Sequence, residues 1–174
     1  MSKELRQHIN LDSGVIVKEA YWLDGKLHRR PNEGPAVVTR DVSFDYTVMV
    51  TCEEYREHGR LHREDGPAQI VRDRKTRTVT LEEYRVKGRL HRNSVQGPAL
   101  LIRDAKTSIA VREHYVEIGK FHRDPFDGPA IIERNGKTGA VWKEEYWQHG
   151  AKLAEPERSA STRSPRSIKD VPTL

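Results

Sequence analysis

One nine-residue pattern occurs four times in this chain, and this repetition constrains the fold more than any other feature. Each full copy starts with tyrosine, has glycine at its fifth position and ends in Leu-His-Arg or Phe-His-Arg; the copies begin at Tyr21, Tyr55, Tyr84 and Tyr115. A partial fifth copy starts at Tyr146, and the five tyrosines are 34, 29, 31 and 31 residues apart. Such a period predicts an array of similar units stacked side by side.

The residues inside each unit indicate strands and tight turns. Asp24-Gly25 and its counterparts at Gly59, Gly88 and Gly119 suit two-residue hairpins, which need residues with positive φ. We expect a further tight turn at Asn135-Gly136. Gly-Pro-Ala follows each full copy and suits the start of a strand, where proline removes no ladder hydrogen bond. We therefore predict an all-β fold, an elongated antiparallel sheet with three short strands per unit and about four and a half units.

The turns also set the expected register of the hairpins. With two-residue turns, Val116 faces Phe121 and Tyr115 faces His122, and the other copies follow suit. A glutamate lies two residues before each tyrosine, on the same face. We expect one face to carry a hydrogen-bonded structural cluster from Glu19, Tyr21, His28, Glu53, Tyr55, His62, Glu82, Tyr84, His91, Glu113, Tyr115 and His122. The other face should carry Leu27, Leu61, Leu90 and Phe121.

The best-preserved unit, Gly-Arg-Leu-His-Arg-Glu-Asp-Gly-Pro-Ala at residues 59–68, resembles the variant MORN-type repeats of uncharacterised phage, bacterial and large-virus proteins. The resemblance covers roughly residues 15–150. It implies an elongated sheet of stacked hairpins used for scaffolding and partner binding, with some members at acidic lipids. The Leu-His-Arg and Gly-Pro-Ala elements depart from the standard MORN pattern, so these roles are not transferred directly.

Composition divides the chain into an N-terminal cap (residues 1–14), the repeat array (15–153) and a flexible tail rich in Ser, Pro and Arg (154–174). Only 35% of residues are hydrophobic, which suits a thin core of stacked repeats. The net charge is +5, but acidic and basic residues interleave throughout. Without a membrane-length apolar run or a secretory leader, and with Cys52 alone and expected to serve packing, we expect a cytoplasmic protein.

Eight histidines raise the question of a metal site or an enzyme. The repeated histidines fall in separate units, so we expect no metal site and no cofactor. Catalysis needs one site with differentiated groups, and four near-identical copies offer none. The common nucleophile, phosphate-loop and zinc motifs are also missing from the sequence. We therefore expect a protein that is not an enzyme.

The expected function is protein binding through an extended surface, for example as a phage or mobile-element factor that inhibits a host defence complex. The candidate contacts are Trp22, Trp142 and Trp147 near the ends of the array, and the repeated arginines Arg29, Arg63, Arg92 and Arg123. Alternatively, the tryptophans cap the terminal repeats and the arginines pair with glutamates of adjacent strands. The competing function is binding of nucleic acid or another polyanion through the arginines and the basic tail. The oligomeric state stays open.

Overall fold

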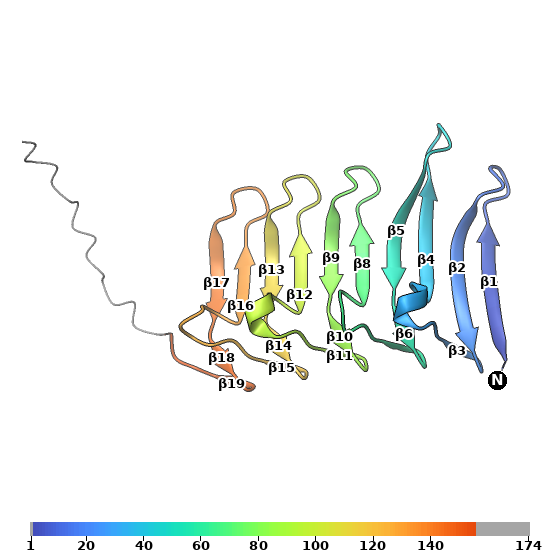
Figure 1. The fold of residues 1–174 in the computed structure, drawn as a ribbon. Coiled ribbons are helices and arrows are strands. Elements are labelled where there is room, and N and C mark those ends of the chain that lie inside the picture. The colour runs from blue at the N-terminus through green and yellow to red at the C-terminus, as the bar shows by residue number, and fades with distance from the viewer. Residues whose placement is uncertain (1, 156–174) are drawn as a thin grey trace, which may run out of the picture.

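The computed structural model describes residues 2–155 and consists mainly of one large antiparallel sheet. Ten strands follow one another across the sheet in chain order, and the edge strands are β1 and β17 (Figure 1). A row of small hairpins lies along one end of these strands (Figure 1). The predicted all-β fold with an elongated antiparallel sheet is confirmed.

The elements have the following bounds. The long strands are β1 (Lys3–Ile9), β2 (Ile16–Leu23), β4 (Val37–Val42), β5 (Val48–Glu54), β8 (Gln69–Arg72), β9 (Val79–Glu83), β12 (Leu100–Arg103), β13 (Ala110–His114), β16 (Ile131–Arg134) and β17 (Val141–Glu145). The two-residue strands are β3 (Lys26–Leu27), β6 (Arg56–Glu57), β7 (Arg60–Leu61), β10 (Arg85–Val86), β11 (Arg89–Leu90), β14 (Val116–Glu117), β15 (Lys120–Phe121), β18 (Trp147–Gln148) and β19 (Ala151–Lys152). Two 3₁₀ helices, η1 (Pro31–Glu33) and η2 (Ser94–Gln96), lie in the loops before β4 and β12.

The predicted hairpin turns have the expected backbone. Ile118 and Gly119 have φ of 50° and 78°, and the other copies have similar angles, so both turn positions are left-handed. The register also agrees with the prediction, since Val116 lies opposite Phe121. In each of the four full copies the histidine N–H donates to the tyrosine carbonyl, with N···O distances of 2.9–3.0 Å.

Two details of the prediction are wrong. Each complete unit has four strands rather than three, because the strand expected to end at the tyrosine continues past it as half of a separate hairpin. Tyr55, for example, separates β5 from β6, and its N–H donates to Ala68 in the following loop. The expected tight turn at Asn135-Gly136 is instead a longer loop: the N–H of Gly139 donates to Asn135, whose side chain accepts from Lys137 and Thr138.

Two places account for the uneven spacing of the tyrosines. The β4–β5 hairpin is longer than its counterparts, with extra pairs at Asp41–Met49 and Val42–Val48. This explains the spacing of 34 residues between the first two tyrosines. Conversely, Arg63 and Gly66 are closer in sequence than Arg92 and Gly97, which shortens the next spacing to 29 residues.

Neighbouring units are joined through their small hairpins as well as through the main sheet. At one junction the N–H of Gly88 donates to the carbonyl of Leu61, and the N–H of Arg63 donates to the carbonyl of Arg85. The same two hydrogen bonds recur at the other junctions, and the partial fifth unit supplies Gly150 and Trp147 for the last. Each unit is therefore held by the next unit along the chain, as in other repeat arrays.

The core is thin and spread along the array. Among residues 2–155 no large side chain is completely buried, whereas the alanines of the four Gly-Pro-Ala sequences are 0% exposed. The best-packed cluster contains Tyr115, Ala130 and Ile132, with Trp147 against it. Neither η1 nor η2, the helices of the described residues, is long enough to cross a membrane.

The Ile118 turn gives a test of this fold. Ile118 is β-branched, 68% exposed and left-handed, a conformation that costs such residues about 1–2 kcal/mol. We expect Ile118→Asn to raise the free energy of unfolding by about 1 kcal/mol and the melting temperature by about 2–4 °C. Val95→Asn is the control, because Val95 is 84% exposed without a positive φ. Calorimetry that shows no gain for Ile118→Asn over this control would contradict the turn assignment.

Candidate partner-binding surface

The arginine that ends each nine-residue copy lies over the tyrosine that begins it. The distance from the Arg29 guanidinium carbon to the Tyr21 ring centre is 4.0 Å. The equivalent distances are 4.0 Å for Arg63 over Tyr55, 3.9 Å for Arg92 over Tyr84 and 3.9 Å for Arg123 over Tyr115. Such cation–π contacts stabilise a fold by about 0.5–2 kcal/mol each, depending on exposure.

Each guanidinium also lies close to the glycine of Gly-Pro-Ala. A Cβ added to Gly97 would lie 2.9 Å from Nη1 of Arg92, and the closest guanidinium atoms at Gly34, Gly66 and Gly128 would be 3.0–3.2 Å away. Arg92 also donates to the carbonyl of Pro98 at 3.2 Å, as Arg29 and Arg123 do to Pro35 and Pro129. We call the set of arginine, tyrosine and glycine in each unit the arginine clamp. It explains why the motif contains these three residues.

The glutamates of the expected cluster pair with a different row of arginines. Arg40, Arg72 and Arg103 bind Glu19, Glu53 and Glu82 with N···O distances of 2.5–2.6 Å, and Arg134 binds Glu113 in the same way. These four glutamates therefore bind this second arginine row, whereas Arg63 binds Asp65 at 2.8 Å. Pairing of Arg29, Arg63, Arg92 and Arg123 with glutamates of adjacent strands stays a prediction. The second arginine row follows the aliphatic strand segments and reaches the glutamates across the sheet.

The histidines connect neighbouring units. Nδ1 of His62 accepts a hydrogen bond from the N–H of Lys87, a left-handed turn residue of the next unit, at 3.2 Å. His28, His91 and His122 make the same contact with His58, Ile118 and His149 at 3.1–3.3 Å. The three residue types of the expected cluster thus have three different main partners, although Tyr115 also donates to Glu113 at 3.4 Å. The predicted cluster was based on pairing within one unit, so it did not include the hydrogen bonds that join each histidine to the next unit.

The three tryptophans lie near the two ends of the array but differ in exposure. Trp147 packs against the Tyr115 cluster, and its Nε1 donates to Glu145 at 2.9 Å. Trp22 lies under the guanidinium of Arg6, 4.5 Å from its ring centre. Trp142, on edge strand β17, is 66% exposed. Of the predicted tryptophan contacts, Trp142 offers the most surface to a partner, and its binding role stays a prediction.

Residues 2–155 contain no group of three or more His, Cys, Asp or Glu side chains placed to hold a metal ion. Cys52 is half-buried, and burial raises the pKa of its thiol. A hollow of about 760 Å³ lies between the second and third units, beside the short Arg63–Gly66 loop. Its lining combines Asp65 with Arg63 and Arg92, so it has no single charge preference.

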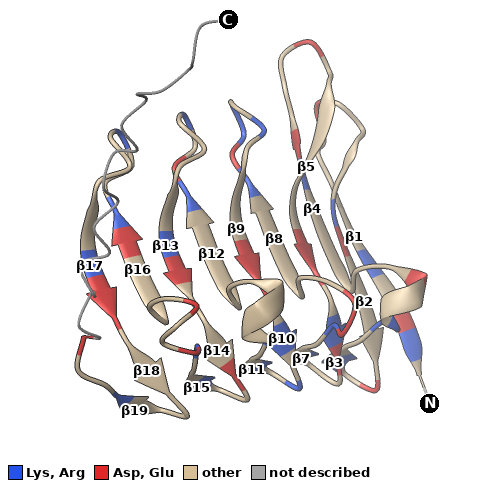
Figure 2. Ribbon diagram, turned by 60° about the vertical axis from the view of Figure 1, so that its left-hand side comes forward, with Lys and Arg blue, Asp and Glu red and all other residues tan. Residues whose placement is uncertain are grey.

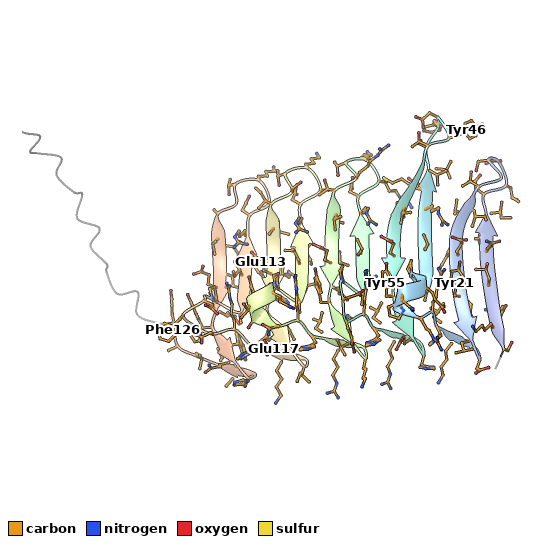
Figure 3. The ribbon with its side chains drawn as sticks, in the orientation of Figure 1. Tyr21, Tyr46, Tyr55, Glu113, Glu117 and Phe126 are labelled. Atoms are coloured by element: carbon orange, nitrogen blue, oxygen red, sulfur yellow. The ribbon has the colours of Figure 1, made fainter. Side chains whose placement is uncertain are left out.

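The longer β4–β5 hairpin presents two aromatic side chains at its end, which we call the hairpin tip (residues 43–47). The exposed fraction is 107% for Phe44 and 69% for Tyr46. The hairpin extends beyond its neighbours, and Tyr46 lies at its end, well away from the clamp residues Tyr21 and Tyr55 (Figures 1 and 3). Val48, at the start of β5, is also exposed. These apolar groups lie outside the clamps, the Glu–Arg pairs and the histidine contacts described above.

Hydrogen bonds hold the hairpin tip in one conformation. The N–H of Ser43 donates to Thr47, and the N–H of Tyr46 donates to Ser43, both at 3.0 Å. Asp45 accepts from the hydroxyl of Ser43 and the N–H of Thr47, and these bonds lower its pKa to about 2. Tyr46 has a φ of 60°, which is unusual for an aromatic residue. The tip is therefore an ordered, negatively charged turn that directs two aromatic rings into solvent.

The sequence contained a signal for this tip that the repeat analysis did not use. Five of the six tyrosines belong to the repeats, and Tyr46 is the exception. It lies within the longest tyrosine spacing, where the chain adds residues that the other units lack. Phe44 and Tyr46 therefore lie outside the residues that every unit repeats.

Comparisons with known proteins do not place this chain in a family. No protein-family model, curated protein or solved structure matches it. The resemblance to variant MORN-type repeats therefore stays a prediction.

The arginine clamp predicts that Gly97 tolerates no side chain. Its φ and ψ are 124° and −174°, a region that costs other residues about 1–3 kcal/mol, and its Cβ would press on Arg92. We expect Gly97→Ala to lower the free energy of unfolding by about 2–3 kcal/mol in urea titrations. Gly25→Ala is the control, because Gly25 has a φ of 76° but open space around its Cβ, so about 1 kcal/mol is expected. Equal losses for the two variants would contradict the clamp.

Proposed function

We propose that this chain is a non-enzymatic protein-binding module whose anchor is the hairpin tip. The observation that carries the proposal is the exposure of Phe44 and Tyr46 on an ordered turn outside the repeat motif. Exposed aromatic rings keep apolar surface in water, and aromatic residues are enriched among those that dominate protein–protein binding. The partner is expected to have an apolar pocket that accepts an aromatic ring.

The order of the tip supports this proposal. Its turn is closed by backbone hydrogen bonds and by Asp45, so binding does not have to order the loop. A preorganised loop loses less conformational entropy when a partner binds. The long β4–β5 pairing also carries the tip beyond the neighbouring hairpins, so a partner can reach it without touching the rest of the array (Figure 1).

The charges of the described surface favour a protein partner over a polyanion. Asp41 and Asp45 lie on or beside the tip, and Asp45 is ionised at neutral pH because its pKa is about 2. Acidic and basic residues are interleaved along the strands (Figure 2). Arg29, Arg63, Arg92 and Arg123 are stacked on tyrosines. The tail expected to assist polyanion binding lies, from residue 156 on, outside the described residues.

The test is affinity capture with the full chain from its native host, using Phe44→Ser/Tyr46→Ser. We expect the double variant to fold normally, since both rings are exposed, and to lose at least about tenfold of the captured partner. Phe126→Ser is the matched control, because Phe126 is 100% exposed on a loop of the fourth unit. It should capture the partner as well as the unmodified chain does.

Two results would contradict the proposal. Capture that is unchanged in the double variant would show that the tip is not the anchor. Capture of nucleic acid that falls steeply between low and physiological salt would support the polyanion function instead. The expectation that the partner belongs to a host complex blocked by a phage factor stays a prediction.

A further inference from the structure

Edge strand β1 has an unpaired side that is unusually accessible. Among residues 2–155 it is the first strand of the sheet and pairs only with β2, and all seven of its residues are exposed. The unpaired N–H and C=O groups of an edge strand can hydrogen-bond to another strand. The direction of these groups along β1 decides which registers with another strand are possible.

The odd-numbered residues of β1 present their backbone groups to the free side. The N–H of Asp24 donates to Ser2, and the N–H of Tyr21 points the other way, to Ala36 in the loop before β4. Leu5 lies opposite Tyr21, so the backbone groups of Leu5 do not bond to β2. Because bonding alternates along an antiparallel pair, Lys3 and Gln7 share this orientation with Leu5.

A second copy of β1 fits this edge when the two strands run antiparallel with Leu5 opposite Leu5. The backbone N–H and C=O groups of Leu5 then bond to those of Leu5 in the other copy, and Lys3 of each copy bonds to Gln7 of the other. All of these backbone groups are ones that point to the free side of β1. In the same register Glu4 lies directly opposite Arg6 of the other copy, twice by symmetry. We propose that the chain forms a two-fold symmetric dimer through this β1–β1 pairing. This inference is independent of the proposed role of the hairpin tip.

Charge selects this register over its neighbours. Centring the pair on Arg6 would place two arginines directly opposite each other, which is destabilising. Centring it on Gln7 would place Arg6 opposite His8 and would use only residues 5–9. The Leu5 register alone puts opposite charges face to face and keeps Lys3 to Gln7 paired.

The side chains of β1 supply the charges for this contact. The Arg6 guanidinium is stacked on Trp22 of β2 at 4.5 Å, and it would turn toward the free side to face Glu4 of a second copy. Glu4 and Arg6 of one chain bind each other at 2.6 Å. Pairing would therefore bring two such pairs side by side, with each charge next to an opposite charge of the other copy. On the opposite face, Leu5 is 47% exposed and would be covered by its equivalent.

Site-specific crosslinking tests the register. In the full chain with Cys52→Ser, Leu5→Cys places two thiols on residues whose Cα atoms are about 5.5 Å apart, within disulfide range. Gln7→Cys is the matched control, because its two copies would be about 13 Å apart. We expect mild oxidation to give a disulfide-linked dimer with Leu5→Cys and not with Gln7→Cys. Equal crosslinking, or more with Gln7→Cys, would overturn the proposal.

Solution mass, measured by analytical ultracentrifugation, tests the charge pairing. We expect the unmodified chain to reach the mass of a dimer and no more. Arg6→Glu should weaken association by about tenfold or more, because it places like charges opposite each other, and Glu4→Arg/Arg6→Glu should restore it. A monomer at every concentration, a mass that keeps rising with concentration, or a double variant as weak as Arg6→Glu would each overturn the proposal.

Discussion

The arginine clamp is the interaction on which the rest of the array depends. Each guanidinium lies over a tyrosine ring and close to a glycine, and three of the four also donate to the following proline carbonyl. The clamp fixes the loop that leads from each small hairpin into the next long strand. Since that loop contains the buried alanine and leads to the start of the strand, the clamp helps to set the geometry of each of the four full units.

This arrangement allows a stable sheet without a thick core. Each unit contributes a clamp, a Glu–Arg pair and a histidine that accepts from the next turn, and these contacts are made along the array. The residues that recur in each repeat are thus used for the packing of the repeats themselves. The exposed parts that do not repeat include the hairpin tip with Phe44 and Tyr46 and the edge strand β1, on which the two proposals rest.

Much of the fold could be predicted because its determinants are local. Glycine at the fifth position and a two-residue turn fixed the Val116–Phe121 register, and Gly-Pro-Ala marked the strand starts correctly. The partners of His62 and Arg63 could not be predicted in the same way. His62 accepts a hydrogen bond from a residue of the next unit, and Arg63 packs on the Tyr55 ring although a glutamate would have been an equally suitable partner. The Asn135 loop was missed because its side chain accepts two backbone hydrogen bonds and prevents the expected Asn-Gly turn.

The central claim, that the repeat motif exists to form the clamp, is tested most directly by a double-mutant cycle between Tyr84 and Arg92. Tyr84→Leu, Arg92→Met and the double variant are unfolded in urea, and the coupling free energy is taken from the three differences. The clamp predicts a favourable coupling of about 1–2 kcal/mol for a partly buried cation–π pair. Additive losses, with a coupling below about 0.3 kcal/mol, would contradict it.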